Sequence, residues 1–142
     1  MAGYSGTPLW RKLGIREGCA VALVGAPAGW SIEDLPERVT LRKRVQGSLD
    51  VVVAFFAALA ELERRLPALI RALPAEGSLW IAWPRKAAGH VSDISENKLR
   101  EIVLPTGLVD VKVAAFDTDW SGLKFVWRKE LRAGVVAAER TR

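Results

Sequence analysis

The chain has 142 residues, half of them apolar, which fits one compact domain with a sizeable core. Lysine and arginine number 21 against 16 acidic residues, so the formal net charge is +5. No apolar run approaches the roughly 20 residues that span a bilayer, and the first residues lack the apolar stretch of a signal peptide. We therefore expect a cytoplasmic protein without a membrane partner. Cys19 is the single cysteine, which excludes an internal disulfide and a cysteine-based zinc site.

The first half of the chain predicts one short helix and three strands. Thr7 can cap a helix that begins with Pro8 and ends at Gly14. Residues 20–25 form a continuous apolar run, as in a strand covered on both faces. Residues 39–45 alternate apolar and basic side chains, which is typical of a half-exposed edge strand. Residues 49–56, "LDVVVAFF", are the most apolar and predict a central strand.

The second half continues with helices and strands in alternation. Apolar residues three or four apart over residues 59–73 predict an amphipathic helix, which Pro67 should kink or restart. Residues 78–83 predict another buried strand. Asp93 and Glu96 have the spacing of a capping box at the start of the next helix.

The last two strand patterns, residues 109–116 and 123–129, are separated by "DTDWSG". This connection is too short for a helical crossover, so the two strands must be antiparallel. The sequence therefore predicts a single doubly wound, Rossmann-like α/β domain over residues 1–129, with a six-stranded, mainly parallel sheet that ends in an antiparallel hairpin. Residues 130–142 form a basic C-terminal tail that we expect to be partly ordered at best.

That closing hairpin resembles the fold of methyltransferases that use S-adenosylmethionine. By this resemblance "LKFVWRK" should pair with "LWIAWP", which would place Trp127 near Trp80. The segments YSGTPLWRKLGI, VALVGAPAGW, AELERRLPAL, LWIAWPRKA and GLVDVKVAAFDTDWSGLKFV, taken together, resemble a bacterial family known as domain of unknown function 3052. The likeness covers residues 3–128 and implies a small methyltransferase-like Rossmann fold without an established activity.

Ligands of open parallel sheets bind outside the carboxyl ends of the strands. The residues predicted there form a candidate crevice that suits a small anionic or planar ligand, with two cations available to an anion: Gly25, Pro27, Gly29, Trp30, Trp83, Arg85 and Lys86.

Two features of this crevice argue against the methyltransferase cofactor. The loop Gly25-Ala-Pro-Ala-Gly29 lacks the middle glycine of the Gly-x-Gly-x-Gly loop in those enzymes, and Pro27 removes an N–H donor. The second strand ends in basic residues, with no acid before Asp50 to hold a ribose. We therefore expect no cofactor, with S-adenosylmethionine disfavoured, and a non-catalytic ligand-binding or protein-binding module. The alternative is an S-adenosylmethionine-dependent methyltransferase, or another nucleotide-binding enzyme, with atypical cofactor contacts.

The sequence also bears on protein partners, nucleic-acid partners and catalytic or metal-binding residues. Six tryptophans, several at predicted element ends, are compatible with a protein partner or a homodimer. A nucleic-acid partner is a second alternative, carried by basic residues near positions 38–44 and at the end of the chain, but the aromatic and glycine pattern of single-strand binding modules is missing. His90 is the sole histidine, and we expect neither catalysis with Asp93 nor a metal site at Asp117 and Asp119.

Overall fold

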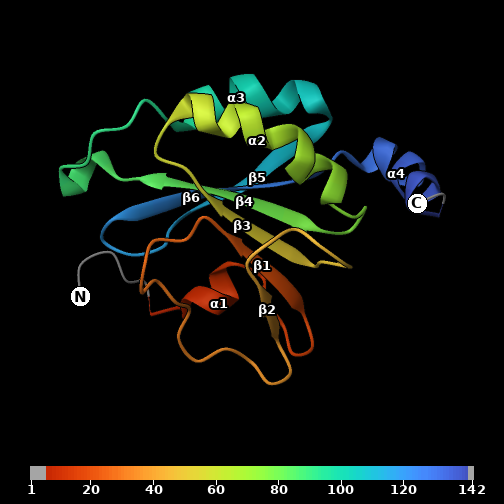
Figure 1. The fold of residues 1–142 in the computed structure, drawn as a ribbon, viewed down its shortest axis with the longest axis horizontal. Coiled ribbons are helices and arrows are strands. Elements are labelled where there is room, and N and C mark those ends of the chain that lie inside the picture. Colours follow the sequence, from red (N-terminus) through yellow and green to blue (C-terminus); the bar gives the residue numbers. More distant parts are fainter. Residues whose placement is uncertain (1–5, 141–142) are drawn as a thin grey trace.

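The computed structural model describes residues 6–140, without the side chain of Arg140. Six strands form one sheet in the order β2-β1-β3-β4-β6-β5 (Figure 1). Their bounds are β1 (Ala20–Val24), β2 (Thr40–Arg42), β3 (Val51–Phe55), β4 (Ser78–Pro84), β5 (Leu108–Ala115) and β6 (Trp120–Trp127). β1 to β4 are parallel, and β6 lies antiparallel to both β4 and β5. The predicted fold class is confirmed.

The burial of each strand agrees with its place in the sheet. All residues of β3 and β4 are buried, as expected of strands that helices and loops cover on both faces. β2 is short, largely exposed and at the edge, where its basic side chains discourage pairing with another chain.

Two apolar layers enclose the sheet. The helices α2 (Leu59–Ala72) and α3 (Glu96–Val103) cover one face, and the short helix α1 (Leu9–Lys12) covers the other together with the loop between β1 and β2 (Figure 1). Short 3-10 turns, η1 (Lys86–Ala88) and η2 (Leu104–Thr106), flank α3. We call these two surfaces the α2/α3 face and the α1 face.

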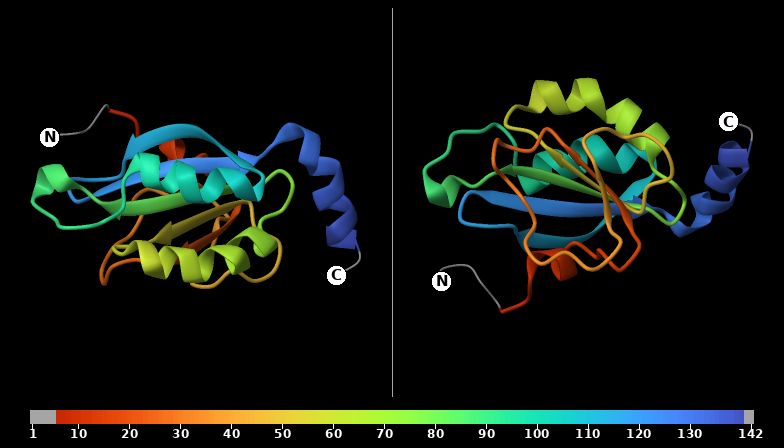
Figure 2. Two further views of the ribbon diagram at one scale, coloured as in Figure 1. Left: turned by 90° about the horizontal axis from the view of Figure 1, so that it is seen from above. Right: turned by 60° about the horizontal axis from the view of Figure 1, so that its bottom comes forward.

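The segment after β6 contains a helix. After the 3-10 turn η3 (Lys129–Leu131) the chain forms helix α4 (Arg132–Arg140), which stands off one end of the sheet (Figure 2). Glu139 fixes it, because its carboxylate accepts a hydrogen bond of 2.9 Å from the backbone N–H of Ala75. The first five residues of the predicted domain and the last two of the tail lie outside the described residues.

The helix signals are correct in place but not in every detail. α2 runs through Pro67 as one helix, since burial of Leu62, Leu66 and Leu69 outweighs one missing backbone bond. Asp93 does not cap the helix that follows it. Ser95 accepts a bond from the backbone N–H of Lys98 and caps α3.

Asp93 instead serves the other helix, because its Oδ1 accepts a 2.8 Å bond from the backbone N–H of Leu59, the first residue of α2. At α1 the cap position is Pro8, with no side-chain capping bond, so the predicted Thr7 cap is wrong.

One expected contact is wrong. β6 pairs with β4 as predicted, but Trp80 is opposite Lys124, three residues before Trp127. Because side chains alternate along a strand, this odd separation puts the two tryptophans on opposite faces. Trp80 donates its indole N–H to Leu13 O (3.1 Å) on the α1 face, while Trp127 donates to Leu73 O (3.0 Å) on the α2/α3 face.

Candidate functional site

The carboxyl ends of the four parallel strands lie at one edge of the sheet, together with the turn between β5 and β6. Pro84, the last residue of β4, is opposite Trp120, the first residue of β6, which sets the turn at this edge. The strand order reverses between β1 and β3, since β2 lies on one side of β1 and β3 on the other. Open α/β sheets bind ligands at such a switch point.

The loop after β1 begins with a glycine that the packing requires. Gly25 has a φ of +70°, and a Cβ there would lie 3.1 Å from the carbonyl oxygen of Phe55 in β3. A tight turn follows, closed by a 3.0 Å hydrogen bond from the backbone N–H of Trp30 to Pro27 O, with Gly29 at a φ of +76° inside it. The turn places the Trp30 side chain against the sheet.

Trp30 ties this loop to the hairpin turn. Its ring meets the Phe55 ring edge-on with centroids 4.7 Å apart and lies 6.2 Å from the Phe116 ring. Its indole N–H donates to Asp117 Oδ2 at 3.0 Å. The other oxygen of Asp117 accepts two backbone N–H bonds within the turn, from Asp119 and Trp120, both at 2.8 Å. Loop and turn therefore form one wall.

A cleft of about 820 Å³ opens beside this wall, on the α1 face. Its volume lies within the roughly 300–1,000 Å³ that small-molecule sites occupy. Three segments line it: residues 6–9, the loop residues Gly29, Trp30, Ser31, Glu33 and Asp34, and the hairpin residues Phe116 and Asp117. The lining includes three carboxylates and no lysine, arginine or histidine. This cleft therefore favours a ligand with positive charge and hydroxyl groups.

Three of the predicted site residues lie elsewhere. Trp83, Arg85 and Lys86 line a smaller pocket of about 250 Å³, closed by residues 94–96 at the start of α3. Trp83 belongs to the apolar layer of the α2/α3 face, so this pocket lies across the sheet from the cleft. The Arg85 guanidinium donates a hydrogen bond of 3.2 Å to Asp117 O.

The structure thus divides the predicted crevice. Gly29 and Trp30 line the large cleft, Trp83, Arg85 and Lys86 line the small pocket, and Gly25 and Pro27 line neither.

Sequence reasoning missed Glu33 and Asp34 because it sought an acid at the end of the second strand. The available signal was an acidic pair just after the glycine turn.

The remaining polar candidates form a different pair from the one considered. His90 Nε2 lies 2.9 Å from Asp119 Oδ1, both side chains are about half exposed, and Asp93 is engaged at α2. Among residues 6–140 there is no group of three or more His, Cys, Asp or Glu side chains placed to hold a metal ion. Within the same range no helix has the length and apolar character needed to traverse a bilayer.

Comparisons with known proteins bear on the fold. No protein-family model matches the chain, and no curated protein matches it. Among solved structures, a SAM-dependent methyltransferase from Aquifex aeolicus has a TM-score of 0.58 at 15% identity, over 82% of this chain and 86% of that one. A ribosomal protein L11 methylase from Lactobacillus delbrueckii subsp. bulgaricus has a TM-score of 0.55 at 14% identity, over 84% and 75%. The Methanococcus jannaschii fibrillarin pre-rRNA processing protein has a TM-score of 0.50 at 16% identity, over 85% and 69%.

These matches correct the expectation of no cofactor, in which S-adenosylmethionine was disfavoured. The matched fold includes a protein described as dependent on that cofactor, so the departures in the glycine loop are no ground for setting it aside. In the structure Pro27 does not line the cleft, whereas Glu33 and Asp34 do. At these identities the likeness establishes architecture: the chain has a Rossmann-like fold of the methyltransferase type.

Proposed function

We propose that the protein binds S-adenosylmethionine in the carboxyl-edge cleft and acts as a methyltransferase with atypical cofactor contacts. The support comes from the fold, the loop after β1 that lines the cleft, and the charges of its lining. We also propose membership in the domain of unknown function 3052 family, on the sequence resemblance described above.

The chemistry of the lining suits this molecule. S-adenosylmethionine carries a positively charged sulfonium, a positively charged amino group, a negatively charged carboxylate and two ribose hydroxyls, so its net charge is positive. It supplies an activated methyl group to a nucleophile. Glu33, Asp34 and Asp117 would accept hydrogen bonds from the amino group and the hydroxyls and would stabilise the positive charge. Asp117 offers the Oδ2 that Trp30 already orients.

The aromatic wall and the open loop backbone complete the fit. Phe116 and Trp30 supply an apolar surface on which a planar base can lie. A Cβ on Gly29 would meet nothing within 4 Å, so the backbone at this turn is open for close approach. The observation that carries the proposal is a large cleft between the loop after β1 and the hairpin turn after β5, with three carboxylates and no cation in its lining.

Isothermal titration calorimetry with S-adenosylmethionine tests the proposal directly. The sharpest variant is Asp34→Asn, because Asp34 has a φ of +55° and asparagine tolerates this conformation at least as well. The substitution therefore removes charge without straining the backbone. Loss of a charge-assisted contact predicts an affinity about 5- to 10-fold weaker.

Glu37→Gln is the matched control, since Glu37 lies in the same loop and does not line the cleft. S-adenosylhomocysteine, which lacks the sulfonium charge, should bind more weakly than S-adenosylmethionine. The proposal is wrong if the wild-type chain shows no binding at millimolar cofactor, or if Asp34→Asn and Glu37→Gln weaken binding equally.

A further inference from the structure

Three cations meet on the α1 face, away from the carboxylate-lined cleft. Lys112 of β5 and Lys124 of β6 are direct cross-strand partners. Because Leu123 and Phe125 pack into the α2/α3 layer, Lys124 between them faces the opposite side, toward α1. A Cβ on Gly14, just after α1, would lie 3.6 Å from Lys124 Nζ. We call Arg16, Lys112 and Lys124 the basic cluster.

The charges of this cluster are uncompensated. None of the three forms an ion pair with a carboxylate in the described part of the chain. Like charges directly opposite one another on neighbouring strands are destabilising. Partial burial lowers the pKa of Lys124, and the charges of Lys112 and Arg16 lower that pKa further. The sheet therefore holds positive charge at a net cost to its own stability.

Protection of the sheet edge against pairing with another chain explains the position of only one residue of the basic cluster. A lysine on an edge strand discourages pairing with another chain, and Lys112 lies on the edge strand β5. Lys124 lies on β6, between β4 and β5, where no edge needs protection. Arg16 lies in the segment between α1 and β1 and belongs to no strand. Their convergence on Lys124 needs a different reason.

We propose that the basic cluster binds a phosphate group. Three positive charges complement a phosphate monoester, a pyrophosphate or adjacent phosphodiesters better than a single carboxylate, and both lysine and arginine donate charge-assisted hydrogen bonds to phosphate oxygens. Lys112 uses one N–H donor on Lys12 O at 3.3 Å and has two more.

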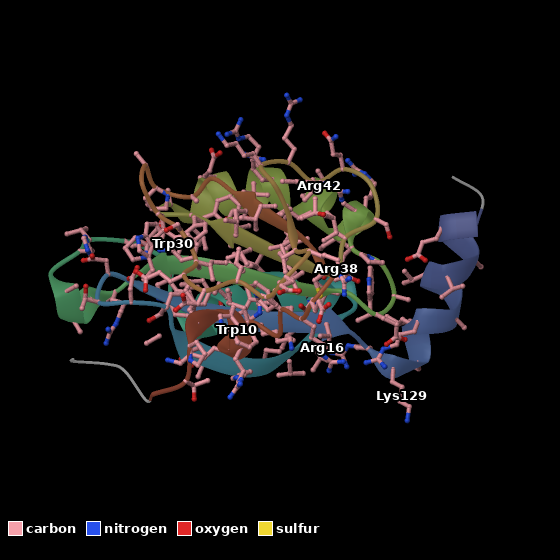
Figure 3. The ribbon with its side chains drawn as sticks, turned by 90° about the horizontal axis from the view of Figure 1, so that it is seen from below. Trp10, Arg16, Trp30, Arg38, Arg42 and Lys129 are labelled. Carbon is pink, nitrogen blue, oxygen red and sulfur yellow. The ribbon has the colours of Figure 1, made fainter. Side chains whose placement is uncertain are left out.

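The site is separate from the cofactor cleft. Figure 3 shows Arg16 on the α1 face toward the end where Lys129 lies, with Trp30 at the other end. Trp30 lines the cleft, whereas no member of the basic cluster does. Phosphate binding therefore stands or falls independently of S-adenosylmethionine binding.

The test follows the lysine side-chain NMR signals during titration with pyrophosphate, inorganic phosphate and a ten-residue oligothymidylate, at ionic strength held constant with sodium chloride. We expect the Lys124 signal to shift and its pKa to rise toward the ordinary lysine value as phosphate occupies the site. Lys124→Gln and Lys112→Gln should each weaken binding at least about fivefold. Both variants should fold, since each removes a like-charge contact.

Lys98→Gln removes the same charge from α3 and is the control that should bind as the wild type. Binding of pyrophosphate without the oligonucleotide would assign a small phosphate ligand, and competition between the two probes would assign a nucleic-acid phosphate at the same site. The proposal fails if no phosphate probe moves the Lys124 signal, if acetate moves it equally, or if the control variant loses as much affinity as the cluster variants.

Discussion

Trp30 should be the anchor that holds the loop after β1 to the hairpin turn. Replacing it with phenylalanine keeps a ring against Phe55 and Phe116 but removes the donor to Asp117 Oδ2. Hydrogen bonds to charged groups contribute about 1.5–3 kcal/mol, and Asp117 keeps two backbone donors, so we expect a loss of about 1 kcal/mol in the free energy of unfolding.

Replacing Trp30 with alanine also removes both ring contacts and most of the apolar burial. Each aromatic contact contributes about 0.5–1.5 kcal/mol, and Trp30 is half-buried, so the total loss should be about 3 kcal/mol. The measurement is urea unfolding followed by far-ultraviolet circular dichroism, because tryptophan fluorescence would change with the substitution itself.

Trp10→Phe is the matched control, as the Trp10 ring contacts Arg11 and no hydrogen bond of its indole is described. It should cost less than about 0.5 kcal/mol. If Trp30→Phe costs as much as Trp30→Ala, the ring contacts contribute nothing and the anchoring argument is refuted. If neither variant changes the unfolding midpoint, the loop is not held by Trp30 at all.

Three further predictions concern the sheet and its helices. Gly122→Ala places a Cβ 2.4 Å from the Phe116 ring and should cost about 1–3 kcal/mol in urea unfolding, whereas Gly134→Ala, with nothing within 4 Å, should not destabilise. Asp93→Ala removes the acceptor of the first backbone N–H of α2 and should cost about 1 kcal/mol, while Asp93→Asn should retain most of the stability. Because the folded state lowers the pKa of Lys124, the unfolded chain binds the proton more tightly. The wild-type chain should therefore be less stable than Lys124→Gln at pH 7, and this difference in the free energy of unfolding should shrink as pH rises toward 10.5. An unchanged difference between pH 7 and 10.5 would contradict this reasoning.

Local patterns predicted most of the architecture. Strands are predicted by the apolar runs, the helix by the 3.6-residue period over residues 59–73, and the hairpin by the short "DTDWSG" connection. Each of these signals lies in consecutive residues of the chain. The errors arose where a side chain serves a distant element. Asp93 has the spacing of a local cap, yet its carboxylate accepts from Leu59, 34 residues away.

The candidate site likewise contains residues that local sequence patterns identify and residues that they do not. Gly29 and Trp30 were identifiable because a glycine turn after a buried strand is a local signal. Glu33, Asp34 and Asp117 were not identifiable as neighbours, since the loop after β1 and the turn after β5 meet only when β6 inserts beside β4. The convergence of Arg16, Lys112 and Lys124 likewise has no counterpart in sequence spacing.

The sequence by itself determined the strands and helices up to residue 129, which strands are central, and that the last two strands run antiparallel. Alternation and turn length are properties of a few consecutive residues, so no other part of the chain is needed to infer them. Only the tertiary structure decided which charges share a cleft and which face each tryptophan occupies. Those outcomes depend on sheet register and strand order, which bring together residues up to about a hundred positions apart.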